Sequence, residues 1–554
     1  MEPFWIKNYP ENVPSDINPK QFATILELID KAISEHGPKI AFTNFGHSLS
    51  FNDISRLSLR FASFLQNNIR LKKGDAIALM LPNLLQYPVA IMGALRAGLT
   101  VVNVNPLYTP RELRYLLKES EAKAIVILEN FGKTLEEVLP DSFVEHVFLT
   151  RMGDLLPFPK SALINFVIKY IKKMVPHFEL PGVFSFKTAI EEGDESRYQR
   201  PSLSGEDVAF LQFTGGTTGP AKGAMLTHSN MVANTLQVLT WFLQGPGVKL
   251  SPAICPLPLY HIFALLADCF VYFSMGVECI LITNPRDLKG FIKELRKTEF
   301  SSIIGVNTLF KALLNHPRFR SIDFSHLQLA LGGGMAVEKD VADKWQKMTG
   351  RPLHEAYGLT EASPAVSINA LDIKVFTGSI GFPLPSTLVS IRDESGKELE
   401  VGEEGELWVK GPQVFKGYWR NETDTKKVLT DDAWLHTGDI AKLNQQGLIF
   451  ILDRKKDMIN VSGFNVYPSE IEDIVTRHEK VLEACAVAVP DEKSGEAVKL
   501  FVVKKQDDLT KEELVAYCRE NLVSYKVPKI IEWRQDLPKS PVGKILRKDL
   551  KNIL

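Results

Sequence analysis

The alternation of apolar and polar positions along the chain predicts strands that take turns with helices. Residues 75–80, DAIALM, form an apolar run typical of a buried strand, and residues 83–97 follow with a helical pattern. The next helix is predicted to begin after Thr109, because a proline follows it and Glu112 completes a capping box. Residues 124–128, AIVIL, are the next predicted strand. This repeated order favours an α/β fold with parallel sheets covered by helices.

The pattern changes in the last third of the chain. From about residue 376, glycines and prolines separate short predicted strands such as residues 388–392 and 405–410. These short strands indicate a small β-rich subdomain at about 376–453.

A run of charged residues at 453–457, DRKKD, is the candidate hinge between two domains. A compact α+β unit follows it, in which the pattern at Ser469 and Glu472 predicts a capping box and hence a helix start. We therefore expect a large N-terminal domain at 1–453, built of parallel βαβ-type sheets, and a small mobile α+β C-terminal domain at 454–554.

The composition excludes a disordered or fibrous chain, because 45% of the 554 residues are hydrophobic and 24% are charged. Lysine and arginine total 65 against 66 acids, so the formal net charge of −1 gives no overall field that would attract nucleic acid. The five cysteines form no CxxC pair. This spacing disfavours a zinc site or a disulfide framework and favours the reduced thiols of a cytoplasmic protein.

Two observations argue against a segment that crosses a membrane. The N-terminus has acids and prolines where a signal peptide needs an apolar run. Residues 264–282, ALLADCFVYFSMGVECILI, are the best candidate for a span, but they include Asp268 and Glu278, and each charge is costly in hydrocarbon. We expect these residues to form a buried helix and strand instead.

A different segment, residues 161–174, is a candidate for contact with a membrane surface. Its sequence, SALINFVIKYIKKM, places at helical spacing the apolar residues Leu163, Ile164, Val167, Ile168 and Ile171. The segment carries positive charge on Lys169, Lys172 and Lys173 and contains no acidic residue. Two interpretations stay open: a basic amphipathic helix in a lipid interface, or a surface helix docked on its own core.

A loop rich in glycine and threonine follows a predicted strand at 208–213. Glycines let backbone N–H groups approach an anion closely, hydroxyl groups add donors, and a lysine adds a point charge for phosphate. The loop is not a Walker A motif, because Ala221 precedes the lysine and no serine or threonine follows it. We expect phosphates of a nucleotide to contact Thr214, Gly215, Gly216, Thr217, Thr218, Gly219, Lys222 and Gly223.

Five motifs together resemble the adenylate-forming acyl-CoA synthetase superfamily, in order and in spacing. They are the loop at 214–223, YGLTE at 357–361, WLHTGD at 434–439, DRKKDMI at 453–459 and PKSPVGK at 538–544. A narrower resemblance, to the bacterial long-chain-fatty-acid–CoA ligases, rests on NVNPLYTPREL at 103–113, the glycine pair at 215–216, PLPLYHIFA at 256–264 and SGFNVYP at 462–468.

The resemblance implies that a fatty acid is activated with ATP to an acyl-adenylate and then transferred to CoA, which feeds fatty acid degradation or lipid synthesis. The active site would lie between the two domains. Magnesium would be the cofactor, with Glu361 as its ligand. The implied catalytic residues are Lys544, Glu361, Thr360 and Lys222, and further contacts to the nucleotide would come from Gly333, Gly334, Tyr357, Asp439 and Arg454.

The resemblance also implies where the acid and CoA react. His261 would border the carboxylate of the acid and position it, and the acyl site would include Phe263, Leu265 and Gly332, although core packing explains the apolar side chains equally well. Lys456 matches the residue about which the C-terminal domain rotates. Gly463 belongs to the loop presented for thioester formation.

Several alternatives stay open from the sequence. The substrate can be a medium-chain or aryl acid, or the protein can be an acyl-AMP ligase that passes its product to a carrier protein. A catalytically inactive, lipid-binding membrane protein is the contrasting class. Long-chain acids arrive from lipid, so we expect peripheral association with the cytoplasmic face of the membrane. Relatives suggest a homodimer.

Overall fold

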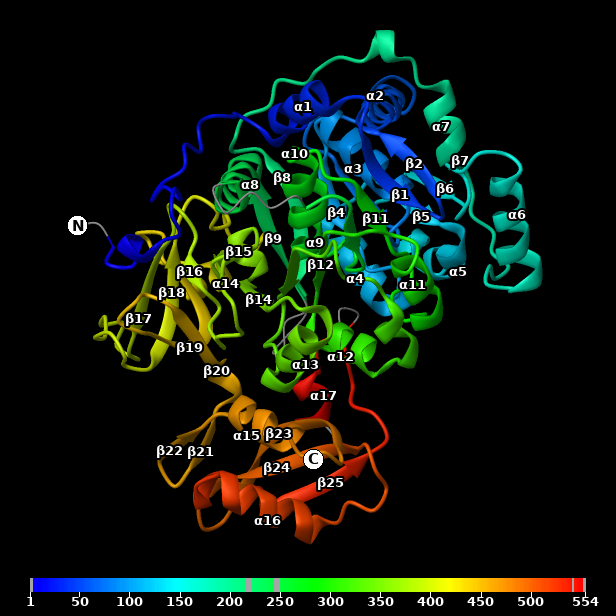
Figure 1. Ribbon diagram of the computed structural model, residues 1–554. Helices are drawn as coiled ribbons and strands as arrows, with labels where there is room; N and C mark the ends of the chain where they lie inside the picture. The colour runs from blue at the N-terminus through cyan, green and yellow to red at the C-terminus, as the bar shows by residue number, and fades with distance from the viewer. Residues whose placement is uncertain (1–2, 215–220, 244–249, 541–542, 552–554) are drawn as a thin grey trace.

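The structure is a computed structural model that describes residues 3–214, 221–243, 250–540 and 543–551. Figure 1 shows a large N-terminal domain above a smaller C-terminal domain. The predicted α/β architecture is confirmed, with a large domain built on two mainly parallel sheets. The predicted boundary between residues 453 and 454 stays a prediction.

The first sheet of the large domain has nine strands. Its strands, in spatial order, are β16 (Phe382–Pro383), β15 (Ala365–Ile368), β14 (Leu353–Gly358), β13 (Leu329–Gly332), β12 (Ser302–Gly305), β10 (Ala253–Cys255), β11 (Cys279–Leu281), β1 (Ile40–Asn44) and β2 (His47–Ser50). The strands from β14 to β1 run parallel.

The second sheet has seven strands. They are, in order, β7 (Val183–Ser185), β6 (His146–Thr150), β5 (Ala124–Leu128), β3 (Ala76–Met80), β4 (Thr100–Asn103), β8 (Val208–Thr214) and β9 (Lys222–Thr227). All neighbours are parallel except β8 and β9, which form an antiparallel pair. One apolar cluster joins both sheets through buried residues of the helices α2 (Phe51–Asn67), α3 (Gln86–Arg96) and α8 (His228–Leu243).

Two smaller sheets complete the fold. An antiparallel sheet of β17 (Leu388–Arg392), β18 (Gly405–Lys410), β19 (Leu435–Leu443) and β20 (Ile449–Arg454) forms the β-rich region expected from the sequence. The C-terminal domain has a five-stranded sheet of β21 (Ile459–Val461), β22 (Phe464–Val466), β23 (Val481–Asp491), β24 (Gly495–Lys504) and β25 (Ile530–Arg534), with helices α15 (Pro468–Thr476), α16 (Lys511–Asn521) and α17 (Arg547–Lys551).

One predicted capping box is confirmed and the other is wrong. Helix α4 (Pro110–Ser120) begins as expected, with reciprocal hydrogen bonds between Thr109 and Glu112. Helix α15 has Tyr467 as its N-cap, without a side-chain cap. The helix begins at Pro468, so Ser469 lies within its first turn and cannot be the N-cap, and Glu472 forms an ion pair with Arg547 instead.

The segment at 264–282 is buried, as the sequence predicted. It forms two helical stretches and the strand β11 inside the large domain. Among the described residues, no helix has the length and apolar character needed to cross a bilayer. All five cysteines are free and buried.

The segment at 161–174 lies at the surface and presents its apolar side chains outward. It forms the helix α6 (Lys160–Phe166) and an adjoining helical turn at Val167–Ile171. Of the apolar residues predicted to face a core, only Ile168 is buried. The exposed fraction is at least half for Phe158, Leu163, Phe166, Tyr170, Ile171 and Met174. Ile164 packs against the core of the large domain and Val167 is half-buried, so part of the apolar face is docked and both interpretations stay open.

The apolar cores of the two domains are separate. Three clusters of buried apolar side chains lie wholly within residues 5–449, and two lie wholly within residues 459–550. Among the described residues, none of the five clusters includes buried side chains from both domains. The association of the domains therefore depends on other contacts.

Candidate active site

The edge of the seven-stranded sheet brings the ends of the glycine- and threonine-rich loop together. Thr214, the last residue of β8, lies opposite Lys222, the first residue of β9. The predicted phosphate contacts Gly215, Gly216, Thr217, Thr218 and Gly219 lie outside the described residues. Gly223 pairs with Phe213 in the same hairpin, and its carbonyl accepts a hydrogen bond from the backbone of Trp419.

The ammonium of Lys222 has two partners from a distant part of the chain. It forms an ion pair of 2.8 Å with Asp424 and lies 5.1 Å from the centre of the Tyr418 ring. The Lys222 ammonium beside it holds the pKa of the Asp424 carboxyl well below its ordinary range. These contacts hold the Lys222 side chain at the start of β9.

Glu361 lies in a short helical turn directly after strand β14. Its Oε1 accepts a hydrogen bond of 2.7 Å from the hydroxyl of Tyr418, and its backbone oxygen accepts one from Phe415. Tyr418 therefore connects Glu361 with Lys222. Thr360, the first residue of the turn, lies beside Glu361 in the same half-buried stretch.

Asp439 and Arg454 lie opposite each other on β19 and β20, and their side chains form an ion pair of 2.7 Å. Tyr357 donates a hydrogen bond to the other oxygen of Asp439. The Asp439 side chain is 3% exposed, so burial raises its pKa, while the positive charge of Arg454 opposes that rise. Each carboxylate oxygen keeps a second lone pair, so the group can accept further hydrogen bonds.

Three consecutive glycines, Gly332 to Gly334, end strand β13. A side chain at Gly333 would collide with the ring of Phe263, and Gly334 has a φ of +73°. Glycine is therefore required at Gly333 by the packing of Phe263 and at Gly334 by its backbone conformation. Leu265 is fully buried.

His261 precedes Phe263 and accepts a hydrogen bond from its backbone N–H. Burial, with a smaller contribution from the positive Lys544, lowers the pKa of His261 to about 4. A histidine with this pKa is neutral at pH 7 and is a weak base, which favours the predicted positioning role over general-base catalysis.

Lys544 comes from the C-terminal domain but lies among residues of the large domain. Hydrogen bonds between Ser540 and Lys544 close its loop. Gly543 packs closely against Thr308, so that a side chain at residue 543 would collide with the Oγ1 atom of Thr308. Partial loss of solvent, together with the positive Arg454, lowers the pKa of Lys544 to about 8, while Asp439 opposes that shift.

The two residues predicted for the CoA step lie on the hinge side of the C-terminal domain. Loss of solvent lowers the pKa of Lys456, which follows β20. Gly463 lies in the turn between β21 and β22 with a φ of +87°, and no described atom lies within 4 Å of the position of a Cβ. The positive charge of Lys456 is one of those that lower the pKa of Lys544, so this residue lies near the Lys544 side chain.

Sequence reasoning missed the residues that hold the predicted ones in place. Asp424 and Tyr418 lie about 200 positions from Lys222, so no local spacing points to this pairing. A separate group, Cys255, Asp268 and Cys279, has ligand atoms within 4.8 Å of one another. Burial raises the pKa of all three. These groups are therefore protonated at neutral pH and belong to the core.

The structure has the architecture of an α/β enzyme with two domains. The candidate site is a cluster of charged side chains where the two domains meet, and the smaller domain contributes Lys544 to it. The family described as "AMP-binding enzyme" matches residues 29–419, and the "AMP-binding enzyme C-terminal domain" matches residues 470–544. The chain belongs to this family of AMP-binding enzymes.

Full-length relatives cover the whole chain. It is 52% identical over 554 residues to a long-chain-fatty-acid–CoA ligase of Yersinia pestis, covering 100% of this chain and 98% of that protein. It is 38% identical over 552 residues to a ligase of the same name from Bacillus subtilis, covering 99% and 97% of the two chains.

Solved structures agree over nearly all of the fold. ATP-bound MatB from Rhodopseudomonas palustris matches with a TM-score of 0.81 and 26% identity, covering 95% of this chain and 98% of that one. The anthranilate–CoA ligase AuaEII in complex with anthranoyl-AMP matches with a TM-score of 0.86 and 20% identity, covering 97% and 99%. The second match shows the fold alone.

The pKa of Lys544 predicts how the first half-reaction depends on pH. If the ammonium form is required, kcat/KM for pyrophosphate release without CoA should be constant below about pH 8 and fall about tenfold per pH unit above it. The Lys544→Arg variant keeps its charge at high pH, so any activity it retains should lack this decline. The same decline in that variant would mean that another group titrates.

Asp439→Asn should weaken the use of ATP, because it removes the charge that faces Arg454 and a strong acceptor. We expect kcat/KM for ATP to fall about 10- to 100-fold, as for the loss of a hydrogen bond to a charged group. Tyr357→Phe, which removes only the hydroxyl that donates to Asp439, is the control and should have a smaller effect. An unchanged dependence on ATP would place Asp439 outside the nucleotide site.

Proposed function

We propose that the protein is an ATP-dependent long-chain-fatty-acid–CoA ligase that acts through an acyl-adenylate. The observation that carries this proposal is the position of Lys544, a residue of the small domain, near Asp439 of the large one and Arg454 at the end of β20. The substrate class is supported by the 52% identity to a long-chain-fatty-acid–CoA ligase across the full length of the chain.

The proposed first step brings an anionic carboxylate against the α-phosphate of ATP, so like charges must be screened. Lys544 would lie between the two groups, and Lys222 would exchange its ion pair with Asp424 for the β and γ phosphates. The ribose hydroxyls would donate hydrogen bonds to Asp439. Positive groups fixed before the reaction stabilise the charged transition state without further reorganisation.

Magnesium fits the donors on the large domain. Glu361 offers a carboxylate whose one oxygen is held by Tyr418, and Mg²⁺ in proteins usually takes one or two carboxylates together with phosphate oxygens of the substrate. When bound, the ion would neutralise charge on the phosphates. Thr360 would donate to the α-phosphate, and Tyr357 would contact the adenine with its ring.

The second step would use a different arrangement of the same two domains. After pyrophosphate leaves, the C-terminal domain would rotate about Lys456, withdraw Lys544 and present the loop of Gly463 to CoA. His261, Phe263, Leu265 and the Gly332 backbone would hold the acyl group through both steps.

We keep the homodimer as a proposal, which sedimentation velocity would test.

The surface segment at 158–174, here called the lysine–aromatic segment, supports peripheral binding to a membrane. Side chains of Phe158, Phe166 and Ile171 are 85%, 54% and 65% exposed. Lys169, Lys172 and Lys173 are exposed among them. Exposed apolar side chains with interleaved lysines suit an interface of anionic lipid, from which long-chain acids would be taken.

The function is tested with purified protein, ATP, Mg²⁺ and acids of graded chain length, with and without CoA. We expect pyrophosphate and acyl-CoA to form fastest with long straight-chain acids and slowly with aryl acids. Acyl-AMP that never reaches CoA would indicate an acyl-AMP ligase, and no pyrophosphate from any acid would exclude an enzyme of this class.

Lys544→Ala in the same assay tests the division between the two steps. Pyrophosphate release should fall at least a hundredfold, because the charge between carboxylate and phosphate is lost, while transfer to CoA from supplied acyl-AMP should persist. Equal loss in both half-reactions would contradict rotation of the domain.

Membrane binding is tested by sedimentation with vesicles that contain phosphatidylserine. Changing Lys169, Lys172 and Lys173 to glutamate should lower binding at low salt about a hundredfold, since each lysine contributes about 1 kcal/mol near anionic lipid. The matched control changes three exposed lysines on the helix α11 (Leu288–Leu295) and just after it, Lys289, Lys293 and Lys297. Equal loss in both variants, or no loss in the first, would place the contact elsewhere.

A further inference from the structure

Asp453 belongs by its backbone to the large domain. It lies on β20 and pairs with Ile440 of β19, one residue before the ion pair between Arg454 and Asp439. Its residue is 4% exposed, and it precedes the proposed pivot at Lys456. When the C-terminal domain rotates, Asp453 would therefore stay with the large domain.

The carboxylate of Asp453 is nevertheless held from the C-terminal side. Its Oδ2 accepts a hydrogen bond of 2.7 Å from the backbone N–H of Ser469, in the first turn of α15, where backbone N–H groups have no partner within the helix. Its Oδ1 lies 3.7 Å from the guanidinium of Arg547. Both partners lie beyond the pivot, so the proposed rotation would break both contacts.

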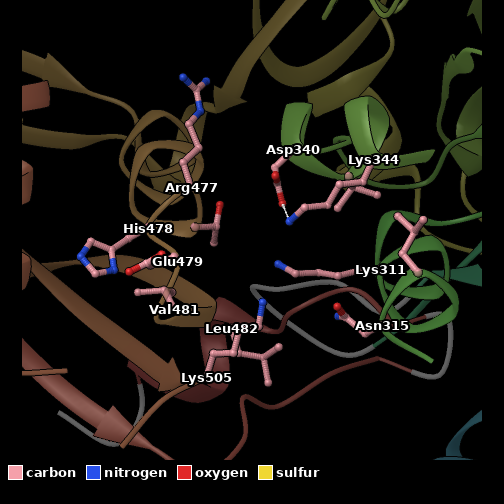
Figure 2. Close-up of a pocket in the computed structure, with 13 residues that line it drawn as sticks. Lys311, Asn315, Asp340, Lys344, Arg477, His478, Glu479, Val481, Leu482 and Lys505 are labelled. Atoms are coloured by element: carbon pink, nitrogen blue, oxygen red, sulfur yellow. Dashed lines mark hydrogen bonds and ion pairs between the residues drawn. The ribbon is translucent and has the colours of Figure 1, made fainter. Parts of the chain in front are cut away.

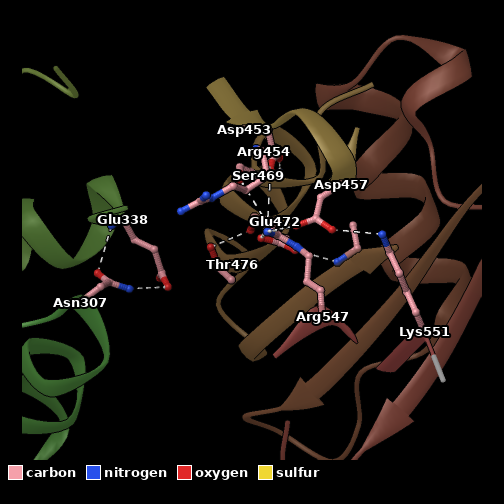
Figure 3. Close-up of polar contacts among 11 residues, drawn as sticks. Asn307, Glu338, Asp453, Arg454, Asp457, Ser469, Glu472, Thr476, Arg547 and Lys551 are labelled. Carbon is pink, nitrogen blue, oxygen red and sulfur yellow. Dashed lines mark hydrogen bonds and ion pairs between the residues drawn. The ribbon is translucent and has the colours of Figure 1, made fainter. Parts of the chain in front are cut away.

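Arg547 connects this contact with the catalytic loop. It lies three residues after Lys544, at the start of α17, and forms two hydrogen bonds of 2.6 and 3.2 Å with Glu472 of α15. Figure 3 shows Arg547 reaching toward Glu472, beside Asp453 and Asp457. Asp453 therefore contacts Arg547, which lies at the end of the loop that carries Lys544.

Another part of the interface between the domains is a pocket lined by several cationic side chains. It is lined from the large domain by Lys311 and Lys344 and from the C-terminal domain by Arg477 and Lys505. Figure 2 shows the two lysines of the large domain pointing into this space. Lys311 and Lys344 form their ion pairs with Glu338 and Asp340 of their own domain.

We propose that Asp453 is a positioning residue for the adenylation half-reaction, because it fixes the C-terminal domain in the orientation that brings Lys544 to the site. The inference rests on the proposed function. Asp453 does not contact the reacting atoms. It acts through Ser469 and Arg547, and its contacts exist in one orientation of the domains only.

The test is Asp453→Asn, which keeps the size of the side chain and removes its charge. A hydrogen bond to a charged group biases an equilibrium about ten- to hundredfold, so adenylation, measured as pyrophosphate release, should fall by about tenfold or more. Transfer to CoA from supplied acyl-AMP should be unchanged or faster. Unchanged adenylation, or equal loss in both half-reactions, would overturn the proposal.

Asp457→Asn is the matched control. Asp457 also faces Arg547, at 3.8 Å, and it pairs with Lys551, but all three residues lie beyond the pivot. The ratio of the two half-reactions should stay as in the unmodified protein. Lys544→Ala separates the two proposals: if it loses adenylation alone while Asp453→Asn has no effect, the function stands and the role of Asp453 fails.

A cross-link measures the orientation directly. Lys344→Cys and Lys505→Cys place thiols on the two sides of the interdomain pocket, and all five native cysteines are buried. A short bis-maleimide should join the two thiols in the otherwise unmodified chain. Adding Asp453→Asn should lower the yield at least severalfold, whereas adding Asp457→Asn should not. Equal yields in all three proteins would overturn the proposal.

Discussion

The ion pair between Asp439 and Arg454 is the contact on which the arrangement of the site depends. It joins the middle of β19 to the last residue of β20, from which the chain leaves for the C-terminal domain. The pair therefore fixes Arg454, where the C-terminal domain begins, relative to the strand β14 and the turn after it, which include Tyr357 and Glu361. Burial disfavours the charged form of Asp439 and raises its pKa, and the positive Arg454 beside it opposes that rise.

The same reasoning explains why the other charged residues are paired. Lys222 is held by Asp424, and Glu361 is held by Tyr418. A charge that is already fixed by the protein loses little conformational freedom when a substrate arrives, which is the basis of electrostatic preorganisation. Lys544 differs from these residues, because its loop reaches the site from the other domain. Its pKa is lowered by loss of solvent and by the positive charge of Arg454.

The sequence predicted the parts of this architecture that depend on local pattern. The strands β3, β5 and β8 and the capping box at Thr109 follow from residues close together in the chain. The partners of the charged residues do not, because Asp424 and Tyr418 meet Lys222 only through the sheet packing. The capping box predicted at Ser469 and Glu472 failed for a local reason: the helix begins at Pro468, before Ser469, and Glu472 pairs with Arg547.

In the proposed mechanism the C-terminal domain takes two orientations against the large domain. The contacts between the domains must therefore be able to break and form again. Burial of apolar surface is non-directional and scales with area, so a large shared apolar core would resist separation in either orientation. The described apolar clusters are confined to one domain or the other, and the contacts made by Asp453 are hydrogen bonds and ion pairs. Such contacts are directional, and water can replace them when they break. An orientation held in this way can be exchanged during each turnover without unfolding either core.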